Sequence, residues 1–404
     1  MTASGATVTR VLDAGESSRN ASRSAVYCAA FVALGLTTAS LGPTLPGLAA
    51  QTHASLGQIG SLFTARSLGF LLGALGAGRL YDRVSGKVLM TASLVLMSGL
   101  MALAPFPPAL WLLTITMVAL GAAEGALDVG GNTLMLWTHG ERAGPYMNGL
   151  HFFYGVGAFL SPLVVALALR FGTGVSPAYY LLALLVLPAF VWGLQTSAPA
   201  AQSISQESQA EATPVGRQLL LVVALFFFLY LGAEVSFGGW IYTYAVTVKL
   251  GGAATAAYLT SAFWGALTVG RLLAIPLAAR LRPRTILLGA LSGCLLSFCL
   301  ILLTPASTVA LWLGTFGVGF SMAPIFPTTF SWAGRRMQIT GRVTSWFLAG
   351  ASAGGMFLPW LAGQLFEAAG ARAAMWAVAA DLLAALFVFK FLCKDSAELS
   401  TNRV

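Results

Sequence analysis

Residues 56–87 read LGQIGSLFTARSLGFLLGALGAGRLYDRVSGK. The part from Leu56 to Leu80 is suited to cross a lipid bilayer as one helix, because a crossing needs about 17 to 25 mostly apolar residues with every backbone group paired. It runs directly into a short charged loop, GRLYDRVSGK, which spans Gly78 to Lys87. The stretch therefore predicts a membrane-spanning helix that ends at a polar interface.

Composition excludes a water-soluble fold for the whole chain. Hydrophobic residues make up 57% of it and charged residues 9%, and the mean hydropathy is +0.82, whereas a soluble domain carries roughly a quarter charged residues. The 45 glycines also indicate a membrane protein, because helices in lipid pack closely through small residues. The net charge of +9 lies in short loops and forms no patch interleaved with aromatic residues, so we expect no nucleic-acid partner.

Eleven further segments meet the same requirement, which predicts an all-α integral membrane protein with 12 transmembrane helices in two pseudo-symmetric six-helix bundles. The other spans expected in the first bundle are Ser24–Ala50, Val88–Ala104, Leu110–Thr138, Tyr146–Arg170 and Ala178–Gln195. The spans expected in the second are Arg217–Leu250, Thr255–Arg280, Thr285–Leu303, Val309–Gly334, Arg342–Phe366 and Arg372–Leu392.

Polar stretches set the expected domain boundaries. Residues 1–23 and 393–404 are predicted cytoplasmic tails, and residues 197–216 a cytoplasmic linker between the bundles 24–196 and 217–392. The linker is rich in Ser, Ala, Gln and Glu and too poor in large apolar residues to form a core. Residues 1–23 lack the apolar core of a cleavable signal, so we expect the first helix to direct insertion.

The two halves show weak internal similarity. Ser67-Leu68-Gly69 matches Thr268-Val269-Gly270, and Gly78-Arg79-Leu80 matches Ala279-Arg280-Leu281 at the same offset. Such a repeat is typical of transporters that bind solute near mid-bilayer, between the halves, and expose it alternately to the two sides. The solute site should therefore lie at the seam.

Basic residues predict the orientation. Seventeen Lys and Arg residues fall on one side of the predicted membrane, three on the other, and Arg66 and Arg271 fall inside helices, which accounts for all 22. Loops rich in Lys and Arg stay in the cytoplasm. We therefore expect a multi-pass protein of the cell (inner) membrane with both termini cytoplasmic.

The loop after the second span resembles the signature loop of the major facilitator superfamily, with Ser85 as one extra residue. Gly78 is expected to let helices approach, while Asp82 accepts bonds from a neighbouring helix N-terminus or arginine and so holds one conformer closed. With Arg83, these residues form a predicted gate rather than a solute site.

Ionisable groups inside the bilayer are the main functional signal, because each costs several kcal/mol unless it is paired or faces water. Glu124, Asp128 and Asn132 recur at four-residue spacing and share one helix face. Arg66 falls at the depth of Glu124, one turn from Asp128, and can pair with either carboxylate. We expect these carboxylates to exchange a proton or bind a cation, or else to form a static ion pair.

The seventh span carries a second candidate site. Glu234 is followed by Gly238, Gly239, Trp240 and Tyr244. A carboxylate can accept bonds from sugar hydroxyls, and an aromatic ring can stack on the C–H face of a sugar, so this segment suits a sugar. The alternative is that Glu234 belongs to a packing network and that the aromatic residues form an interfacial belt.

Four other residues are weaker candidates. His151 of the fifth span and Trp264 of the eighth are further candidate substrate contacts, with packing as the alternative. Arg271 and Asp381 we interpret as structural or gating residues, because neither belongs to a cluster.

Several segments together resemble the branch of this superfamily that holds bacterial fucose and glucose/galactose symporters and animal sodium-dependent glucose transporters. These are LGPTLPGLA (41–49), ARSLGFLLGALGAGRLYD (65–82), LDVGGNTLML (127–136), LHFFYGVGAFLSPL (150–163) and GAEVSFGGWIYTYA (232–245). The resemblance places Asp128 and Asn132 where the fucose symporter has a Glu and an Asn, the Glu being implicated in proton coupling. It places Glu234 on a glutamate that the sugar branch shares.

Two departures accompany the resemblance. The fucose symporter's first-helix carboxylate has no counterpart, since only Thr37, Thr38 and Ser40 are polar there. The fifth span has Ser161-Pro162 in place of the Gly-Pro motif of drug/proton antiporters, which disfavours drug efflux.

The sequence thus predicts cation-coupled symport of a monosaccharide by a monomer in the bilayer, with a proton favoured over sodium. Asp128, Glu124 and Arg66 are the predicted coupling residues, and Asn132, Glu234 and Trp240 the main substrate contacts. A proton-coupled exporter of a drug or metabolite and a sugar sensor are the alternatives. No catalytic triad, metal cluster or phosphate-binding loop is present, so we expect no enzyme activity, cofactor or metal.

Overall fold

The computed structural model describes residues 3–81, 83–170, 174–196 and 217–401, all helical apart from short connections. The first half contains α1 (Ala3–Thr38), α2 (Leu41–Thr52), α3 (Leu56–Ile59), α4 (Ser61–Tyr81), α5 (Gly86–Leu103), α6 (Leu110–His139), the 3-10 turn η1 (Gly140–Arg142), α7 (Ala143–Arg170) and α8 (Ser176–Gln195). The second contains α9 (Arg217–Thr247), α10 (Ala253–Arg280), α11 (Pro283–Leu303), α12 (Thr308–Met322), α13 (Ile325–Gly334), α14 (Gly341–Ala369) and α15 (Ala371–Thr401). The predicted linker, residues 197–216, lies outside the described residues.

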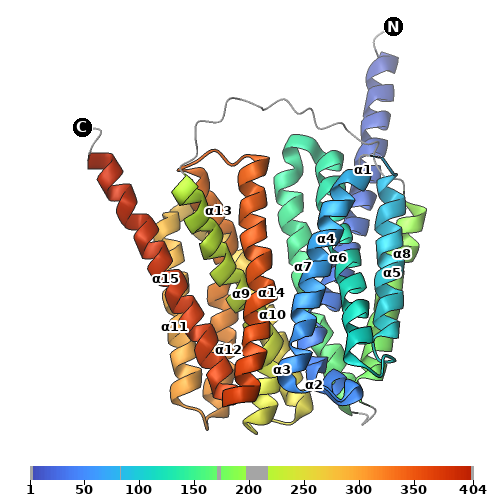
Figure 1. The fold of residues 1–404 in the computed structure, drawn as a ribbon. Coiled ribbons are helices and arrows are strands. Elements are labelled where there is room, and N and C mark those ends of the chain that lie inside the picture. The colour runs from blue at the N-terminus through green and yellow to red at the C-terminus, as the bar shows by residue number, and fades with distance from the viewer. Residues whose placement is uncertain (1–2, 82, 171–173, 197–216, 402–404) are drawn as a thin grey trace.

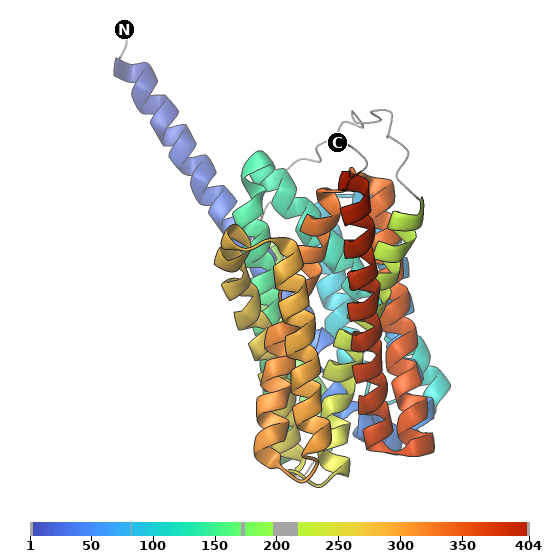
Figure 2. The same cartoon turned by 90° about the vertical axis from the view of Figure 1, so that its left-hand side faces the viewer.

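The two halves stand side by side as helix bundles (Figure 1). α1 begins and α15 ends at the same end of the molecule, called here the terminal end; the other is the opposite end. The predicted tails continue these two helices over residues 3–23 and 393–401, and α1 projects well beyond the bundle (Figure 2).

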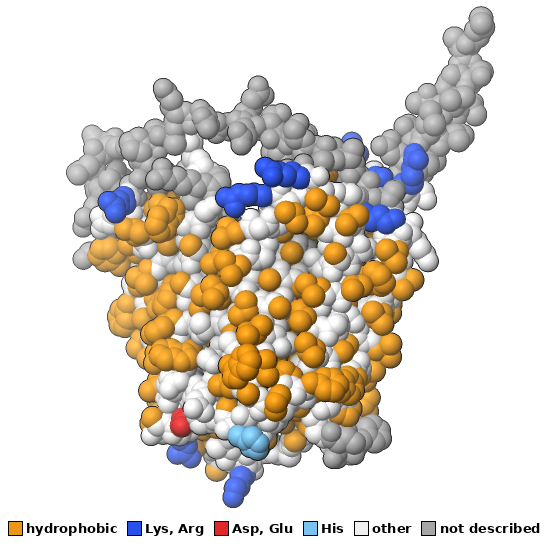
Figure 3. Space-filling model, turned by 45° about the vertical axis from the view of Figure 1, so that its right-hand side comes forward, with side chains coloured by type: hydrophobic (Ala, Val, Ile, Leu, Met, Phe, Trp, Pro, Cys, Tyr) orange, Lys and Arg blue, Asp and Glu red, His pale blue; other side chains and the backbone are white. Residues whose placement is uncertain are grey.

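Each predicted span corresponds to one helix or to a broken pair of helices. Within the described residues, ten helices are long and apolar enough to cross a membrane, or eleven if the bent pair α1 and α2 is one span. α14, the eleventh predicted span, is 29 residues long but falls outside this set. Hydrophobic side chains cover the visible face between the ends, and most of the Lys and Arg there lie at the terminal end (Figure 3). The predicted fold class is confirmed.

The bend between α1 and α2 measures 44°. Pro43 explains it, because proline lacks an N–H and its ring clashes with the carbonyl four residues earlier, at Ala39. The break frees carbonyl groups at the end of α1 that a continuous helix would have used. Acceptors are thereby presented in the middle of the membrane.

Glycines let α4 and α6 approach closely. A Cβ at Gly121 would overlap the carbonyl oxygen of Arg66, and one at Gly69 would overlap that of Val118. Both positions therefore require glycine, as expected for helices packed in lipid. The contact brings Arg66 of α4 beside Glu124 of α6.

At the opposite end the two halves are joined by a seal of polar and aromatic contacts. The Glu367 carboxylate of α14 accepts from the Ser55 hydroxyl at 2.5 Å and from the Gly57 N–H at 2.6 Å. The Gln364 side chain donates to the Gly57 carbonyl at 2.8 Å. The Trp240 ring of α9 packs against Gly60 of the first half. These contacts close the seam at that end.

The α4–α6 contact generates a stability prediction. Gly121→Ala should lower the melting temperature of the purified protein in detergent, because overpacking costs about 1 to 3 kcal/mol. Gly99→Ala is the matched control, since none of the described atoms lies within 4 Å of its Cβ position. Equal melting temperatures for the two variants would contradict the close approach.

The seal generates a pH prediction. Bonds from Ser55 and Gly57 hold the pKa of Glu367, which lies beyond the predicted span, below its usual value. Its contribution to stability is therefore present above the unfolded-state pKa and lost as the pH falls through the folded-state pKa. Glu367→Gln should lower the melting temperature at neutral pH, and the difference from the parent chain should shrink in acid. A difference that does not change with pH would count against the seal.

Candidate functional site

A cavity of about 700 Å³ lies between the two halves, within the range of roughly 300 to 1,000 Å³ typical of small-molecule sites. Its walls come from α1, α2, α4, α6 and α7 on one side and mainly from α9, α10, α13 and α14 on the other. Pro283, Ile286 and Arg335, near the terminal end, line it as well. Because the seal closes the opposite end, the cavity reaches toward the terminal end.

Five of the six ionisable groups predicted inside the bilayer line this one cavity: Arg66, Glu124, Asp128, Glu234 and Arg271. The sixth, Asp381 of α15, is buried and lies outside the cavity wall. The chain thus places five of its six predicted intramembrane charges at the predicted seam.

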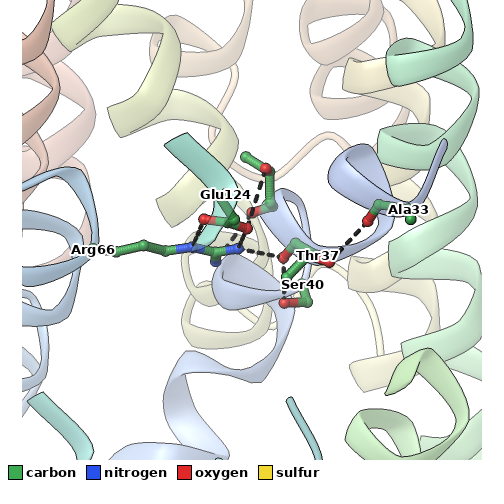
Figure 4. A network of polar contacts seen from close by, with 6 residues as sticks. Ala33, Thr37, Ser40, Arg66 and Glu124 are labelled. Atoms are coloured by element: carbon green, nitrogen blue, oxygen red, sulfur yellow. Dashed lines mark hydrogen bonds and ion pairs between the residues drawn. The ribbon is translucent and has the colours of Figure 1, made fainter. Parts of the chain in front are cut away.

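Arg66 and Glu124 form a two-point ion pair (Figure 4). The Arg66 Nε donates to Glu124 Oε2 at 2.8 Å, and its terminal nitrogen contacts Glu124 Oε1. The same guanidinium donates to the Thr37 carbonyl at 2.6 Å and the Thr38 carbonyl at 3.4 Å, which the break after α1 has freed. Arg66 therefore pairs with Glu124, not Asp128, and all three of its nitrogens have acceptors.

Asp128 lies one turn further along α6 and faces the cavity, half-buried. Within the part of the chain that the structure describes, no ion pair of its carboxylate is found. Asn132 donates to the Asp128 backbone carbonyl at 2.8 Å and does not line the cavity. Asp128 is therefore the carboxylate of α6 that is open to a mobile cation.

Glu234 lies on the opposite wall, on α9. The Tyr230 hydroxyl contacts one carboxylate oxygen, and Arg271 Nη2 of α10 lies 3.8 Å from the other. The Arg271 side chain is 28% exposed, whereas that of Arg66 is 8% exposed. The second half thus carries a looser counterpart of the Arg66–Glu124 pair.

The structure brings some predicted substrate contacts together and separates others. His151 and Trp264 line the cavity with Glu234. Trp240 and Tyr244 are almost fully buried outside its wall, and the Trp240 ring nitrogen donates to the Pro359 carbonyl at 2.9 Å. In this conformation Trp240 belongs to the seal.

Sequence reasoning missed two cavity residues. Tyr154 of α7 is close enough to interact with Thr38 and with the charges of Glu124, Glu234 and Arg271. It sits there because Gly35 and Gly157 let α1 and α7 touch. Arg271, interpreted as structural, also points into the cavity. Only the cost of a buried arginine marked it in the sequence.

The predicted gate has a different geometry from the one expected. Gly78 is exposed, and no atom of the described residues lies within 4 Å of its Cβ position, so in this conformation its side does not pack against a described helix. Arg83 is exposed, and Asp82 lies outside the described residues. Gly78 and Arg83 stand at the terminal end, toward which the cavity reaches.

The chain is similar in sequence to a known family and to curated proteins of animals. The Major Facilitator Superfamily profile matches residues 27–348. The sodium-dependent glucose transporter 1A of Mus musculus is 32% identical over 83% of this chain and 88% of its own length. The human sodium-dependent glucose transporter 1 is 31% identical over 84% of this chain and 73% of its own.

Solved structures share the fold at low sequence identity. The nucleoside transporter NupG superposes with a TM-score of 0.73 at 14% identity, covering 93% of this chain and 99% of that one. A D-xylose-proton symporter superposes with a TM-score of 0.75 at 14% sequence identity, covering 92% of this chain and 97% of that one. The profile match, the relatives and the two-bundle fold together establish that this chain belongs to the major facilitator superfamily.

Proposed function

We propose that this secondary transporter couples the movement of a monosaccharide to that of a cation, with a proton favoured over sodium and uptake over export. The observation that carries the proposal is the carboxylate of Asp128, which faces the cavity without an arginine partner in the described chain. A carboxylate in that position exchanges a cation most readily, because nothing fixed already neutralises it.

Asp128, Glu124 and Arg66 have separate roles in this proposal. The Glu124 side chain contacts two nitrogens of Arg66, and breaking a buried ion pair of this kind typically costs about 3 to 5 kcal/mol. Glu124 therefore anchors Arg66, and Asp128 takes and releases the cation.

The cavity wall supports a neutral, hydroxyl-rich solute. Its described lining carries three basic and three acidic side chains, so the formal charges balance; they are Arg66, Arg271, Arg335, Glu124, Asp128 and Glu234. A basic drug would be expected to need an acidic cavity, so this balance disfavours the exporter. Trp264, Phe63 and Tyr154 supply aromatic surface beside the polar groups, and the relatives named glucose transporters point the same way.

The membrane orientation is part of the proposal. Both termini are cytoplasmic, so the cavity opens inward and the seal faces outward. The loop Gly78–Lys87 would then latch the halves when the cytoplasmic end closes.

The orientation predicts which loops are accessible. In a background with all four native cysteines replaced by serine, Arg372→Cys at the opposite end should react with a membrane-impermeant maleimide in intact cells. Arg83→Cys, exposed at the terminal end, should react only after lysis. The reverse pattern would overturn the orientation.

The coupling role predicts the behaviour of Asp128→Asn in proteoliposomes. Gradient-driven accumulation of the transported sugar should fall to background, while sugar exchange without a gradient should continue, because the binding surfaces remain. Glucose, galactose, fucose and xylose form the panel, each tested with a proton or a sodium gradient.

Asp381→Asn is the matched control, since it removes a buried carboxylate outside the cavity, and it should keep accumulation. Full accumulation by Asp128→Asn would sink the coupling role. If no sugar of the panel moves and none shifts the melting temperature, the monosaccharide proposal fails and dye-efflux assays test the exporter.

A further inference from the structure

The Glu234–Arg271 pair leaves a gap of defined size in the cavity wall. Its nearest nitrogen and oxygen are 3.8 Å apart, whereas a direct hydrogen bond would need about 2.7 to 3.2 Å. The described contacts of Arg271 include no shorter hydrogen bond, and one oxygen of Glu234 is held by Tyr230. The other oxygen and the guanidinium thus retain hydrogen-bonding capacity toward the cavity.

The contrast with Arg66 shows that the gap is not a general property of the site. Arg66 donates from all three nitrogens to Glu124 and to the freed carbonyls of α1. No ligand can gain much from it without breaking those bonds. Of the two arginines that face a glutamate across the cavity wall, Arg271 is therefore the one whose donors are still available to a ligand.

One hydroxyl group fits this gap chemically. An oxygen about 2.8 Å from both atoms can accept a bond from Arg271 and donate its own proton to Glu234. An ammonium group can donate to Glu234, but it cannot accept from Arg271 and is repelled by it. A carboxylate can accept from Arg271, but it has no proton to donate and is repelled by Glu234.

An aromatic surface lies beside the gap. Trp264 and Arg271 are seven residues apart on α10 and share one helix face. The Trp264 ring also lies beside Gly238, one turn from Glu234 on α9. A sugar ring stacked on Trp264 would therefore present a hydroxyl to the gap.

We propose that Glu234 and Arg271 together bind one substrate hydroxyl and thereby select neutral sugars against amino sugars and sugar acids. This inference rests on the proposed sugar transport and assigns its specificity to two residues of the second half. Loss of either charge should admit the analogue that this charge excludes.

The test measures dissociation constants of the purified protein for glucose, glucosamine and glucuronate, read from melting-temperature shifts. The parent chain should bind glucose best. Arg271→Gln should raise the affinity for glucosamine relative to glucose about tenfold or more. Glu234→Gln should raise the affinity for glucuronate relative to glucose by a similar factor. The size follows from the typical strength of hydrogen bonds to charged groups.

Arg372→Gln is the control, because it removes an exposed arginine at the opposite end, outside the cavity wall, and should leave both ratios unchanged. If Glu234→Gln does not fold, Glu234→Asp replaces it. The shorter carboxylate widens the gap, so glucose binding should weaken while glucuronate stays excluded.

Three outcomes separate the proposals. Shifted ratios in the gap variants alone support the specificity assignment. Unchanged ratios in variants that still bind glucose overturn it and leave sugar transport standing. A parent chain that binds none of the neutral sugars overturns both.

Discussion

A buried arginine is the constraint on which the first half depends. A charge in the centre of a bilayer costs about 2.5 to 3.5 kcal/mol even on insertion scales, so Arg66 must find partners inside the protein. Glu124 and two backbone carbonyls supply them. The carbonyls are in reach because the first span bends by 44° directly after Thr38, and Glu124 is in reach because Gly69 and Gly121 let α4 and α6 touch. One ion pair thus fixes three helices.

The second half also places an arginine within the membrane, but it holds this arginine less tightly. Arg271 and Glu234 lie opposite each other without a direct hydrogen bond, and Arg271 keeps part of its surface open to the cavity. A loosely held pair can rearrange around a ligand at little cost, whereas the Arg66–Glu124 pair cannot. This asymmetry supports a division of labour in which the first half holds a fixed framework and the second adapts to solute.

The membrane made much of the fold predictable from sequence. Segment lengths and polarity defined the helices, and spacing on α6 placed Glu124 and Asp128 on the cavity face. The orientation of Trp240 and Tyr244 was not predictable, because α9 is apolar all round and hydropathy cannot distinguish its cavity face from its seal face. The free donors of Arg271 were also hidden, since they depend on a distance between two helices that no local pattern encodes.

Asp128 connects the framework to movement. A transporter that closes around its cavity strips water from each charge inside, and that desolvation disfavours closure unless the charge has a partner. Glu124 already has Arg66, but the carboxylate of Asp128 has no ion-pair partner in the described chain. Closure is therefore favoured when a cation neutralises Asp128, and the locked pair beside it prevents Arg66 from taking over that role. In this proposal, coupling follows from Asp128, the one carboxylate of the described cavity lining that the framework leaves without an ion pair.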